Sequence, residues 1–148
     1  MREYLPLTLG DTLELNAKRF AEIPAYVVGN RQLTHRELLT RARRLASALE
    51  RQGVRKQDRV SILAMNDIEI GEVLAAGQVS GIIIATVNFR LAPPEMAHIL
   101  KDSAPRVLIF EAQYLPVIES LRAQLATIEH YVCIGGSAAW AQDYESFV

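Results

Sequence analysis

The clearest helical pattern in the chain lies between residues 34 and 53. Thr34 and Glu37 have the spacing of a capping box, in which the threonine oxygen caps an early N–H group and the glutamate reaches back. Apolar residues then recur at helical spacing, at Leu38, Ala42, Leu45 and Leu49. Gly53 supplies a C-terminal stop. The pattern predicts an amphipathic helix that begins after Thr34 and ends before Gly53.

Shorter elements precede this helix. Residues 11–20 have a helical pattern with Asp11 as the candidate N-cap, and Pro24 ends that helix. Two short apolar runs, 25–28 and 32–34, flank a Gly-Asn pair at Gly29. A Gly-Asn pair between strands predicts a β-hairpin.

From Asp58 onward, predicted strands and helices alternate. The expected strands are 59–65, 82–87, 107–110 and 131–134, the last of these being the final strand. The expected helices run from a cap at Asn66 and Glu69 to Ser80, from Pro93 and Pro94 to Asp102, and from Tyr114 to Leu125. The unbroken apolar run 82–87 is typical of a strand covered on both faces. The alternation predicts an α/β fold over residues 1–148, a single domain in which a mostly parallel sheet has helices on both faces.

Composition narrows the class of protein. The chain has 148 residues, of which 50% are hydrophobic and 22% charged, values of an ordinary globular protein. Its 16 basic and 17 acidic side chains give a net charge of -1, which argues against a nucleic-acid binder. The single cysteine, Cys133, favours a reducing compartment. The start, 1–10, lacks the apolar core of a signal peptide, and the longest apolar run is too short to cross a bilayer. We therefore expect a cytoplasmic protein with no membrane span.

Few residues suggest chemistry by themselves. Gly135-Gly136-Ser137 follows a predicted strand and is the one candidate phosphate cradle, with a flexible exit loop as the favoured alternative. His130 and Cys133 do not have the spacing of a metal site, and the three histidines are scattered. Ser103 lies beside Asp102, and His98 is one helical turn before that aspartate, but nothing marks the serine as activated. We expect structural roles for all of these, with no catalytic residue and no metal ligand.

A basic stretch also needs an interpretation. Its members are Arg36, Arg41, Arg43, Arg44, Arg51, Arg55, Lys56 and Arg59. Such a stripe can bind a phosphate backbone, and a nucleic-acid protein remains one alternative, testable by salt-sensitive binding. Because glutamates interleave with the arginines and no aromatic residues accompany them, a solvated helix face is favoured.

Read in order, these segments resemble the opening part of the adenylate-forming enzymes, in particular the acyl-CoA synthetase branch. The first group of matches is Leu33-Thr34-His35-Arg36-Glu37-Leu38, then Gly53-Val54, Asp58-Arg59-Val60, Asn66 and Glu69. The second is Gly81-Ile82-Ile83, Asn88-Phe89-Arg90-Leu91, Glu95-Met96, Ile99-Leu100 and Asp102-Ser103. The resemblance extends from about Thr8 to Ile134. Departures such as His35 in place of tyrosine and bulky isoleucines at 82 and 83 look like packing changes.

The resemblance implies a parent enzyme that joins a carboxylic acid to ATP, with Mg²⁺, as an acyl-adenylate and then transfers the acyl group to coenzyme A. The family's phosphate loop ending in Pro-Lys-Gly, its magnesium-binding threonine and glutamate, its ribose-binding aspartate and its catalytic lysine have no counterpart in this sequence and would lie beyond Val148. We therefore expect an N-terminal segment that acts as a scaffold, binds no cofactor alone and is catalytically incomplete. The acyl substrate is not defined by these residues.

The resemblance also singles out Arg90. This arginine follows the strand 82–87, at the carboxyl end where α/β folds bind ligands. In relatives that use coenzyme A, the equivalent loop resembles a contact surface for the nucleotide phosphates of that coenzyme, and an arginine suits phosphate by charge and shape. A structural salt bridge, for example with Glu95, is the alternative role.

Two expectations concern partners. The remainder of the parent synthetase should pack against this segment, and an unpaired sheet edge or uncovered apolar face should make the isolated segment self-associate, most simply as a homodimer. The competing interpretation is a stand-alone α/β interaction module without catalysis. The acid pair and the lysine of a receiver domain are absent from the corresponding positions.

Overall fold

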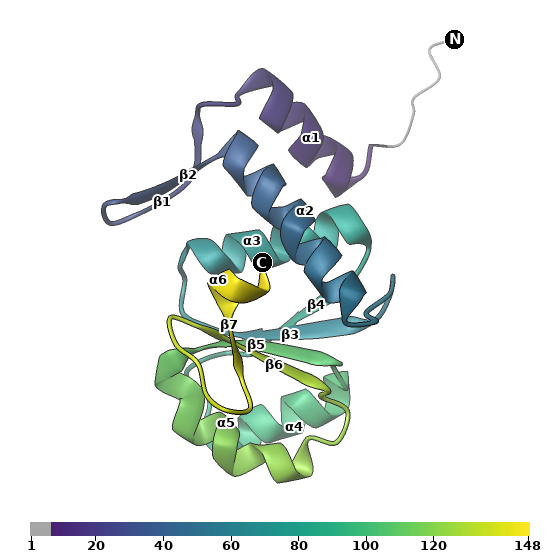
Figure 1. Cartoon of the computed structure of the whole chain (residues 1–148), viewed down its shortest axis with the longest axis vertical. Coiled ribbons are helices and arrows are strands. Elements are labelled where there is room, and N and C mark those ends of the chain that lie inside the picture. The colour runs from purple at the N-terminus through teal and green to yellow at the C-terminus, as the bar shows by residue number, and fades with distance from the viewer. Residues whose placement is uncertain (1–6) are drawn as a thin grey trace.

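A computed structural model describes residues 7–148 (Figure 1). The expectation that 1–10 carries no signal peptide falls largely outside these residues. The strands are β1 (Pro24–Val28), β2 (Arg31–Thr34), β3 (Arg59–Leu63), β4 (Ile83–Thr86), β5 (Val107–Glu111), β6 (His130–Ile134) and β7 (Gln142–Asp143). The α-helices are α1 (Leu9–Arg19), α2 (His35–Arg51), α3 (Ile68–Ser80), α4 (Pro93–Ser103), α5 (Leu115–Leu121) and α6 (Tyr144–Phe147). Short 3₁₀ turns, η1 (Ala112–Tyr114) and η2 (Arg122–Gln124), flank α5.

The predicted parallel sheet is confirmed. Its five strands have the order β4-β3-β5-β6-β7, and every neighbouring pair is parallel. Val60 in β3 pairs with Ile84 on one side and with Val107 on the other, so β3 and β5 are central strands. The prediction that 82–87 is covered on both faces is wrong, because β4 forms an edge of the sheet and the side chain of Ile83 is half-exposed. An apolar run has the same pattern in a central strand and in an edge strand.

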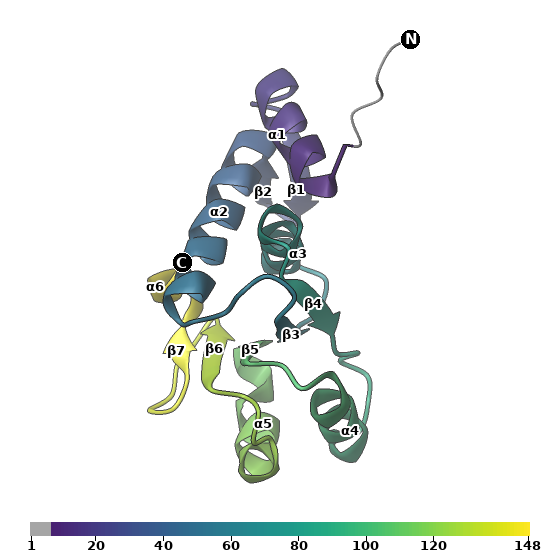
Figure 2. The same cartoon turned by 90° about the vertical axis from the view of Figure 1, so that its right-hand side faces the viewer.

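Helices cover both faces of the sheet, as predicted. Helices α2, α3 and α6 lie over one face, and α4 and α5 lie over the other (Figures 1 and 2). The alternation of side chains along β5 divides the core between them. Val107 and Ile109 belong to the cluster under α2 and α3, whereas Leu108 and Phe110 belong to the cluster over α4 and α5.

The predicted capping box of α2 is confirmed. The Thr34 oxygen accepts a hydrogen bond from the Glu37 N–H at 3.2 Å, and the Glu37 carboxylate accepts one from the Thr34 N–H at 2.9 Å. The four predicted apolar residues of this helix are all buried. Gly53 follows the helix with a φ of 82°, a left-handed conformation that glycine adopts without strain.

Two other predicted caps are wrong by one or more residues. Helix α1 is capped by Thr8, and Asp11 is the third helical residue, whose carboxylate closes a capping box at 2.8 Å. Helix α3 is capped by Asp67 rather than by Asn66. In each case two polar residues within one helical turn can cap, and the sequence alone does not show where the helical backbone begins.

Two further differences arise near the C-terminal end. The helix predicted from Tyr114 to Leu125 is α5 with a 3₁₀ turn at each end, a common arrangement at helix termini. The prediction that 131–134 is the last strand is wrong, because β7 and α6 follow it. These elements have two and four residues, too few to produce a periodic pattern. The intervening loop is anchored by Trp140, whose ring stacks on Phe110 at 5.8 Å.

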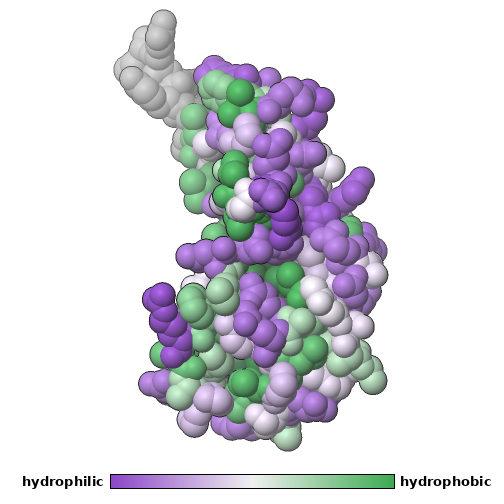
Figure 3. Space-filling model, turned by 90° about the vertical axis from the view of Figure 1, so that its left-hand side faces the viewer, coloured by the Kyte–Doolittle hydropathy of each residue, from purple (hydrophilic) through white to green (hydrophobic). Residues whose placement is uncertain are grey.

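The hairpin β1–β2 projects from the helical layer beside α1 and α2 (Figure 1). Its turn has a positive φ of 56° at Gly29, as a two-residue hairpin turn requires. Tyr26 packs on α3 at Gly71, where an added Cβ would lie 2.6 Å from the tyrosine ring. Ile23, just before β1, and Val27, within it, are exposed hydrophobic side chains. Hydrophobic side chains also lie among the polar ones on the face of the molecule that Figure 3 shows. Within residues 7–148, no helix combines the length and the apolar character needed to cross a membrane.

Candidate functional site

The carboxyl edge of the sheet is the place where this topology can bind a ligand. The chain leaves β3 for β4 on one side, and then returns to the other side of β3 as β5. Open α/β sheets bind ligands at such a change of direction, outside the carboxyl ends of the strands. A crevice of about 430 Å³ lies there. It is lined by Arg31, Asp67, Glu69, Glu111, Ile134, Gly135, Asp143, Tyr144 and Glu145. We call it the acidic crevice.

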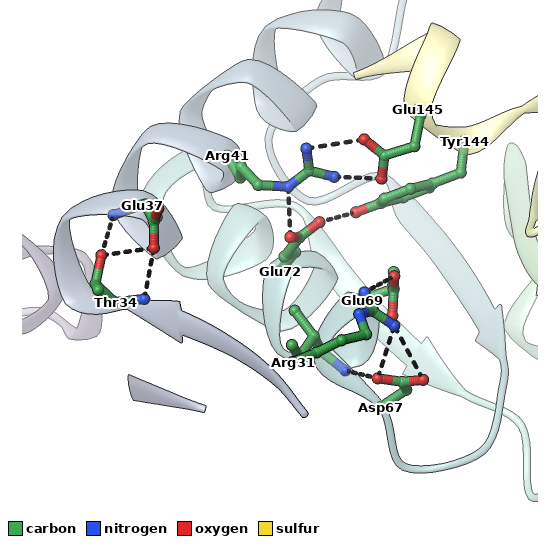
Figure 4. A network of polar contacts seen from close by, with 10 residues as sticks. Arg31, Thr34, Glu37, Arg41, Asp67, Glu69, Glu72, Tyr144 and Glu145 are labelled. Atoms are coloured by element: carbon green, nitrogen blue, oxygen red, sulfur yellow. Dashed lines mark hydrogen bonds and ion pairs between the residues drawn. The ribbon is translucent and has the colours of Figure 1, made fainter. Parts of the chain in front are cut away.

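The carboxylates at the mouth of the acidic crevice are bound by other parts of the chain. Arg31 reaches from the hairpin to Asp67 at 3.2 Å and also pairs with Glu69 (Figure 4). Glu111 accepts a hydrogen bond from the Met65 N–H at 3.0 Å, which joins the ends of β3 and β5. Asp143 caps α6 at 2.9 Å. These acids therefore stabilise the loops that form the crevice.

A largely buried network adjoins the acidic crevice, which two of its members, Tyr144 and Glu145, help to line. We call it the buried network. The carboxylate of Glu72, only 2% exposed, pairs with Arg41 and accepts a hydrogen bond from the Tyr144 hydroxyl at 2.8 Å (Figure 4). Arg41 also binds both oxygens of Glu145, at 2.7 and 3.0 Å. Burial and the adjacent carboxylate of Glu72 raise the pKa of Tyr144 far above its usual range. Burial alone would lower the pKa of Arg41, but its hydrogen bonds to Glu72 and Glu145 raise it, so the guanidinium stays charged.

This network was not predicted from the sequence. Glu72 falls within a helix that was predicted, but it occupies an inward position between apolar neighbours. A charged residue at an inward helical position is the signal that could have revealed it, since charged side chains are rarely buried without a partner. Tyr144 and Glu145 follow β7 in a segment without a pattern, so no such signal marked them.

The charge of the crevice opposes phosphate binding. Gly135, part of the candidate phosphate cradle, lines the acidic crevice together with Asp143 and Glu111. The first turn of α3, which also faces this edge, already carries Asp67 and Glu69. Acids at a helix N-terminus occupy the position that an anion would take. Gly135 has a φ of 75°, which fits the alternative of a loop that leaves the strand.

Arg90 lies at the other end of the carboxyl edge, in the turn after β4. Its N–H donates to the side-chain oxygen of Asn88 at 3.0 Å, and its guanidinium lies over the ring of Phe89 at 5.0 Å. The salt bridge with Glu95, the alternative role, is absent from the described residues. Glu95 instead accepts a hydrogen bond from the Ala92 N–H at 2.8 Å and closes the first turn of α4. Arg90 is exposed to solvent.

The remaining candidates have structural contacts. The Ser103 hydroxyl donates to the Ile99 carbonyl oxygen at 2.7 Å, and the carbonyl of Ser103 accepts from Arg59. Cys133 is buried, and burial raises the pKa of its thiol. Among residues 7–148, no three His, Cys, Asp or Glu side chains come together in a way that could hold a metal ion.

The basic stretch is divided among different partners. Arg43 pairs with Glu14 of α1 at 2.6 Å, and Arg36 pairs with Glu22 at 2.7 Å. Arg55 donates to the carbonyl oxygen of Glu50, at the end of α2, at 2.9 Å. Arg41 belongs to the buried network. The stretch is therefore not a continuous cationic surface, and several of its members join α2 to neighbouring elements.

The fold defines an α/β unit built on a five-stranded parallel sheet, and comparisons with known proteins identify its family. The sequence model of the family described as AMP-binding enzyme matches residues 13–146. The chain belongs to this family.

Comparisons with individual proteins agree with this family assignment. The chain is 37% identical over 134 residues to a fatty acid–[acyl-carrier-protein] ligase of Streptomyces coeruleorubidus, a match that covers 90% of this chain and 25% of that protein. It is 34% identical to a long-chain-fatty-acid–CoA ligase of Thermus thermophilus, covering 90% and 27%. The crystal structure of the N-terminal domain of FACL13 from Mycobacterium tuberculosis superposes with a TM-score of 0.81 at 30% identity, covering 86% of this chain and 34% of that one. The chain thus spans about a quarter of the length of the curated relatives it matches.

Proposed function

We propose that this chain is the N-terminal segment of an ATP-dependent ligase of the acyl-CoA synthetase branch. The observation that carries the proposal is the match of residues 13–146 to the AMP-binding family, while only about a quarter of each relative is spanned. The whole enzyme would join a carboxylate to the α-phosphorus of ATP, with release of pyrophosphate. The thiolate of coenzyme A would then attack the acyl carbon, and AMP would leave.

The role we assign to residues 1–148 is that of a scaffold that folds as one domain. The acids of the acidic crevice are bound within the segment, and their charge opposes a nucleotide phosphate. The ATP, the Mg²⁺ and the carboxylic acid would be held by the remainder of the synthetase. The proposal places the protein in the cytoplasm, in keeping with its one buried cysteine.

The test is pyrophosphate exchange by the purified 148-residue chain. We expect no exchange of labelled pyrophosphate into ATP with any carboxylic acid, whereas the full-length ligase that contains this segment should catalyse it. Exchange by the segment alone would contradict the scaffold role. A reading frame that continues beyond codon 148 into a glycine-rich loop ending in Pro-Lys-Gly would support the ligase, and its absence would favour the stand-alone interaction module.

Arg90 is the residue we assign to coenzyme A, as a contact for its nucleotide phosphates. In the full-length ligase, Arg90→Ala should raise the KM for coenzyme A about tenfold, as expected for loss of one charge-assisted hydrogen bond, and should leave the KM for ATP unchanged. Arg36→Ala is a matched control, because Arg36 is also an exposed arginine and its one ion pair within residues 7–148 is with exposed Glu22. An unchanged KM for coenzyme A in Arg90→Ala would remove the assignment.

We also propose that the isolated segment forms a homodimer. Strand β4 is an unpaired edge on which Ile83 is 49% exposed, and edges of this kind pair with other chains. Ile83→Lys should therefore favour the monomer in light scattering. A wild-type segment that is monomeric at high concentration would contradict this part of the proposal.

A further inference from the structure

The turn that carries Arg90 is fixed by its own hydrogen bonds. The Leu91 N–H donates to the Asn88 carbonyl oxygen at 3.2 Å, which closes the turn. The Arg90 N–H donates to the side-chain oxygen of the same asparagine at 3.0 Å. Asparagine forms such turns readily because its side chain can accept a hydrogen bond from the backbone two residues on. The backbone of Arg90 is thus set before any ligand binds.

The Phe89 ring fixes the other end of the arginine. This ring is half-buried and packs against the hydrophobic cluster between the sheet and α4. The guanidinium of Arg90 lies over it, 5.0 Å from the centre of the ring. A planar guanidinium is attracted to an aromatic face and keeps its N–H groups free at its edge. Because packing against the core fixes the Phe89 ring, the ring can in turn orient the guanidinium of Arg90.

No carboxylate within residues 7–148 competes for Arg90. Glu95, the nearest acid in sequence, is engaged in the first turn of α4. That helix also provides few amide donors for an anion, because Pro93 and Pro94 lack N–H groups and the next two amides bind the Ala92 carbonyl oxygen. Phosphate binding at this end of the sheet therefore depends on the arginine side chain.

We propose that Phe89 is a positioning residue, whose ring presents the guanidinium of Arg90 to the phosphate groups of coenzyme A. Asn88 sets the turn that places one side chain over the other. The inference rests on the proposed contact between Arg90 and coenzyme A. It adds that a stacked, pre-oriented arginine, and not merely a positive charge, makes that contact.

NMR on the 148-residue chain tests the stacking of Arg90 on Phe89 directly. Binding is measured on the full-length ligase, because the segment alone is expected to bind no cofactor. The probe is coenzyme A at low salt up to millimolar concentration, with pantetheine, which lacks the nucleotide phosphates, as the control ligand. In the free protein, ring current should shift the Arg90 side-chain resonances upfield, and Phe89→Leu should abolish that shift while preserving an apolar side chain. Phe89→Leu should also weaken coenzyme A binding about two- to fivefold, the size of an exposed cation–π interaction.

A second comparison excludes a merely structural effect of the leucine. With Phe89 present, Arg90→Lys should weaken binding, because a lysine does not stack in the same way. With Phe89→Leu, the difference in coenzyme A affinity between arginine and lysine at position 90 should become smaller, because only the fit of the guanidinium to phosphate then distinguishes them.

The possible results separate the two proposals. Weaker binding by Arg90→Ala but normal binding by Phe89→Leu would overturn the positioning role and leave the contact intact. Unchanged binding by Arg90→Ala, equal binding of pantetheine, or no detectable binding at millimolar coenzyme A would overturn both.

Discussion

The two ends of the carboxyl edge use charged side chains differently. At the acidic crevice, the charged groups bind one another or the backbone, as Arg31 does with Asp67 and Glu69. At the β4 end, the charge of Arg90 faces no carboxylate within residues 7–148 and rests on an aromatic ring. Both ends lie where α/β folds bind ligands. Their place at the carboxyl edge therefore does not distinguish the two ends, and only the contacts of their charged side chains do.

The difference teaches that location alone does not assign a function to a charged residue. A charge that already has its partners contributes to the free energy of folding, and removing it leaves another buried group unpaired. A charge without such partners can be removed with little effect on the fold. Variants at the two ends should therefore differ in stability, binding or both, and the following predictions run from the largest effect to the smallest.

Glu72→Ala should be the most destabilising of these substitutions. It removes a buried carboxylate that accepts from Arg41 and from the Tyr144 hydroxyl, and it leaves that hydroxyl without a partner. The free energy of unfolding should fall by about 3 kcal/mol, measured by urea denaturation. Glu14→Ala, which breaks an exposed pair with Arg43, is the control and should cost less than about 1 kcal/mol. Equal effects of the two variants would show that the buried network is not stabilising.

Arg31→Ala should have the next largest effect. The arginine is half-exposed, but within residues 7–148 it is the one partner of the buried carboxylate of Glu69. The second oxygen of that carboxylate accepts no hydrogen bond from these residues. Its loss should cost about 2 kcal/mol and should loosen the hairpin from α3. Hydrogen exchange in β1 and β2 should rise more than in β5. A double variant with Glu69→Gln should recover part of the stability, and a further loss would contradict the role of Arg31.

The capping box of α2 predicts a smaller effect that depends on pH. Thr34→Ala should cost about 1 kcal/mol at neutral pH. Hydrogen bonds from the backbone and side chain of Thr34 lower the pKa of Glu37 in the folded protein. The stability that ionised Glu37 adds through the capping box is therefore fully present above the ordinary glutamate pKa, about 4.3. It is lost as the pH falls through the lower pKa that Glu37 has in the folded protein. The difference in unfolding free energy between wild type and Glu37→Ala should shrink in acid. A difference that stays constant to pH about 2 would contradict the shift.

Arg90→Ala should have the smallest effect on stability. The side chain is exposed and its contact with Phe89 is worth about 0.5 kcal/mol, so the urea midpoint should scarcely change. The same variant should weaken coenzyme A binding. Loss of stability comparable to that of Arg31→Ala would place Arg90 among the structural charges and end the contrast between the two ends of the edge.

Much of the fold was predictable from the sequence. Helix α2 is an example. One short stretch of sequence contains its cap, its apolar face and its end, and all three depend on local contacts. The central strands β3 and β5 were also found, since buried parallel strands are continuous apolar runs. The exposed edge at Ile83, the strand β7 and the helix α6 were missed, because neighbours in space define an edge strand and short elements have no period.

The candidate site was predictable only in part. Arg90 was found from its place after a strand and from a family resemblance, but nothing near it in sequence showed whether Glu95 or Phe89 would take its guanidinium. The pairing of Glu72 with Tyr144 joins residues 72 positions apart. Sequence spacing carries no information about such a contact until the sheet brings its carboxyl ends together.

By itself, the sequence determined the alternation of strands and helices, the capping box of α2, and membership of the AMP-binding family over residues 13–146. These follow from local periodicity and from the order of motifs along the chain. The tertiary structure decided which charges have partners. Coulombic attraction and hydrogen bonding act over a few ångströms in space, so only the folded chain shows that the carboxylates of the acidic crevice are bound while Arg90 remains available to a ligand.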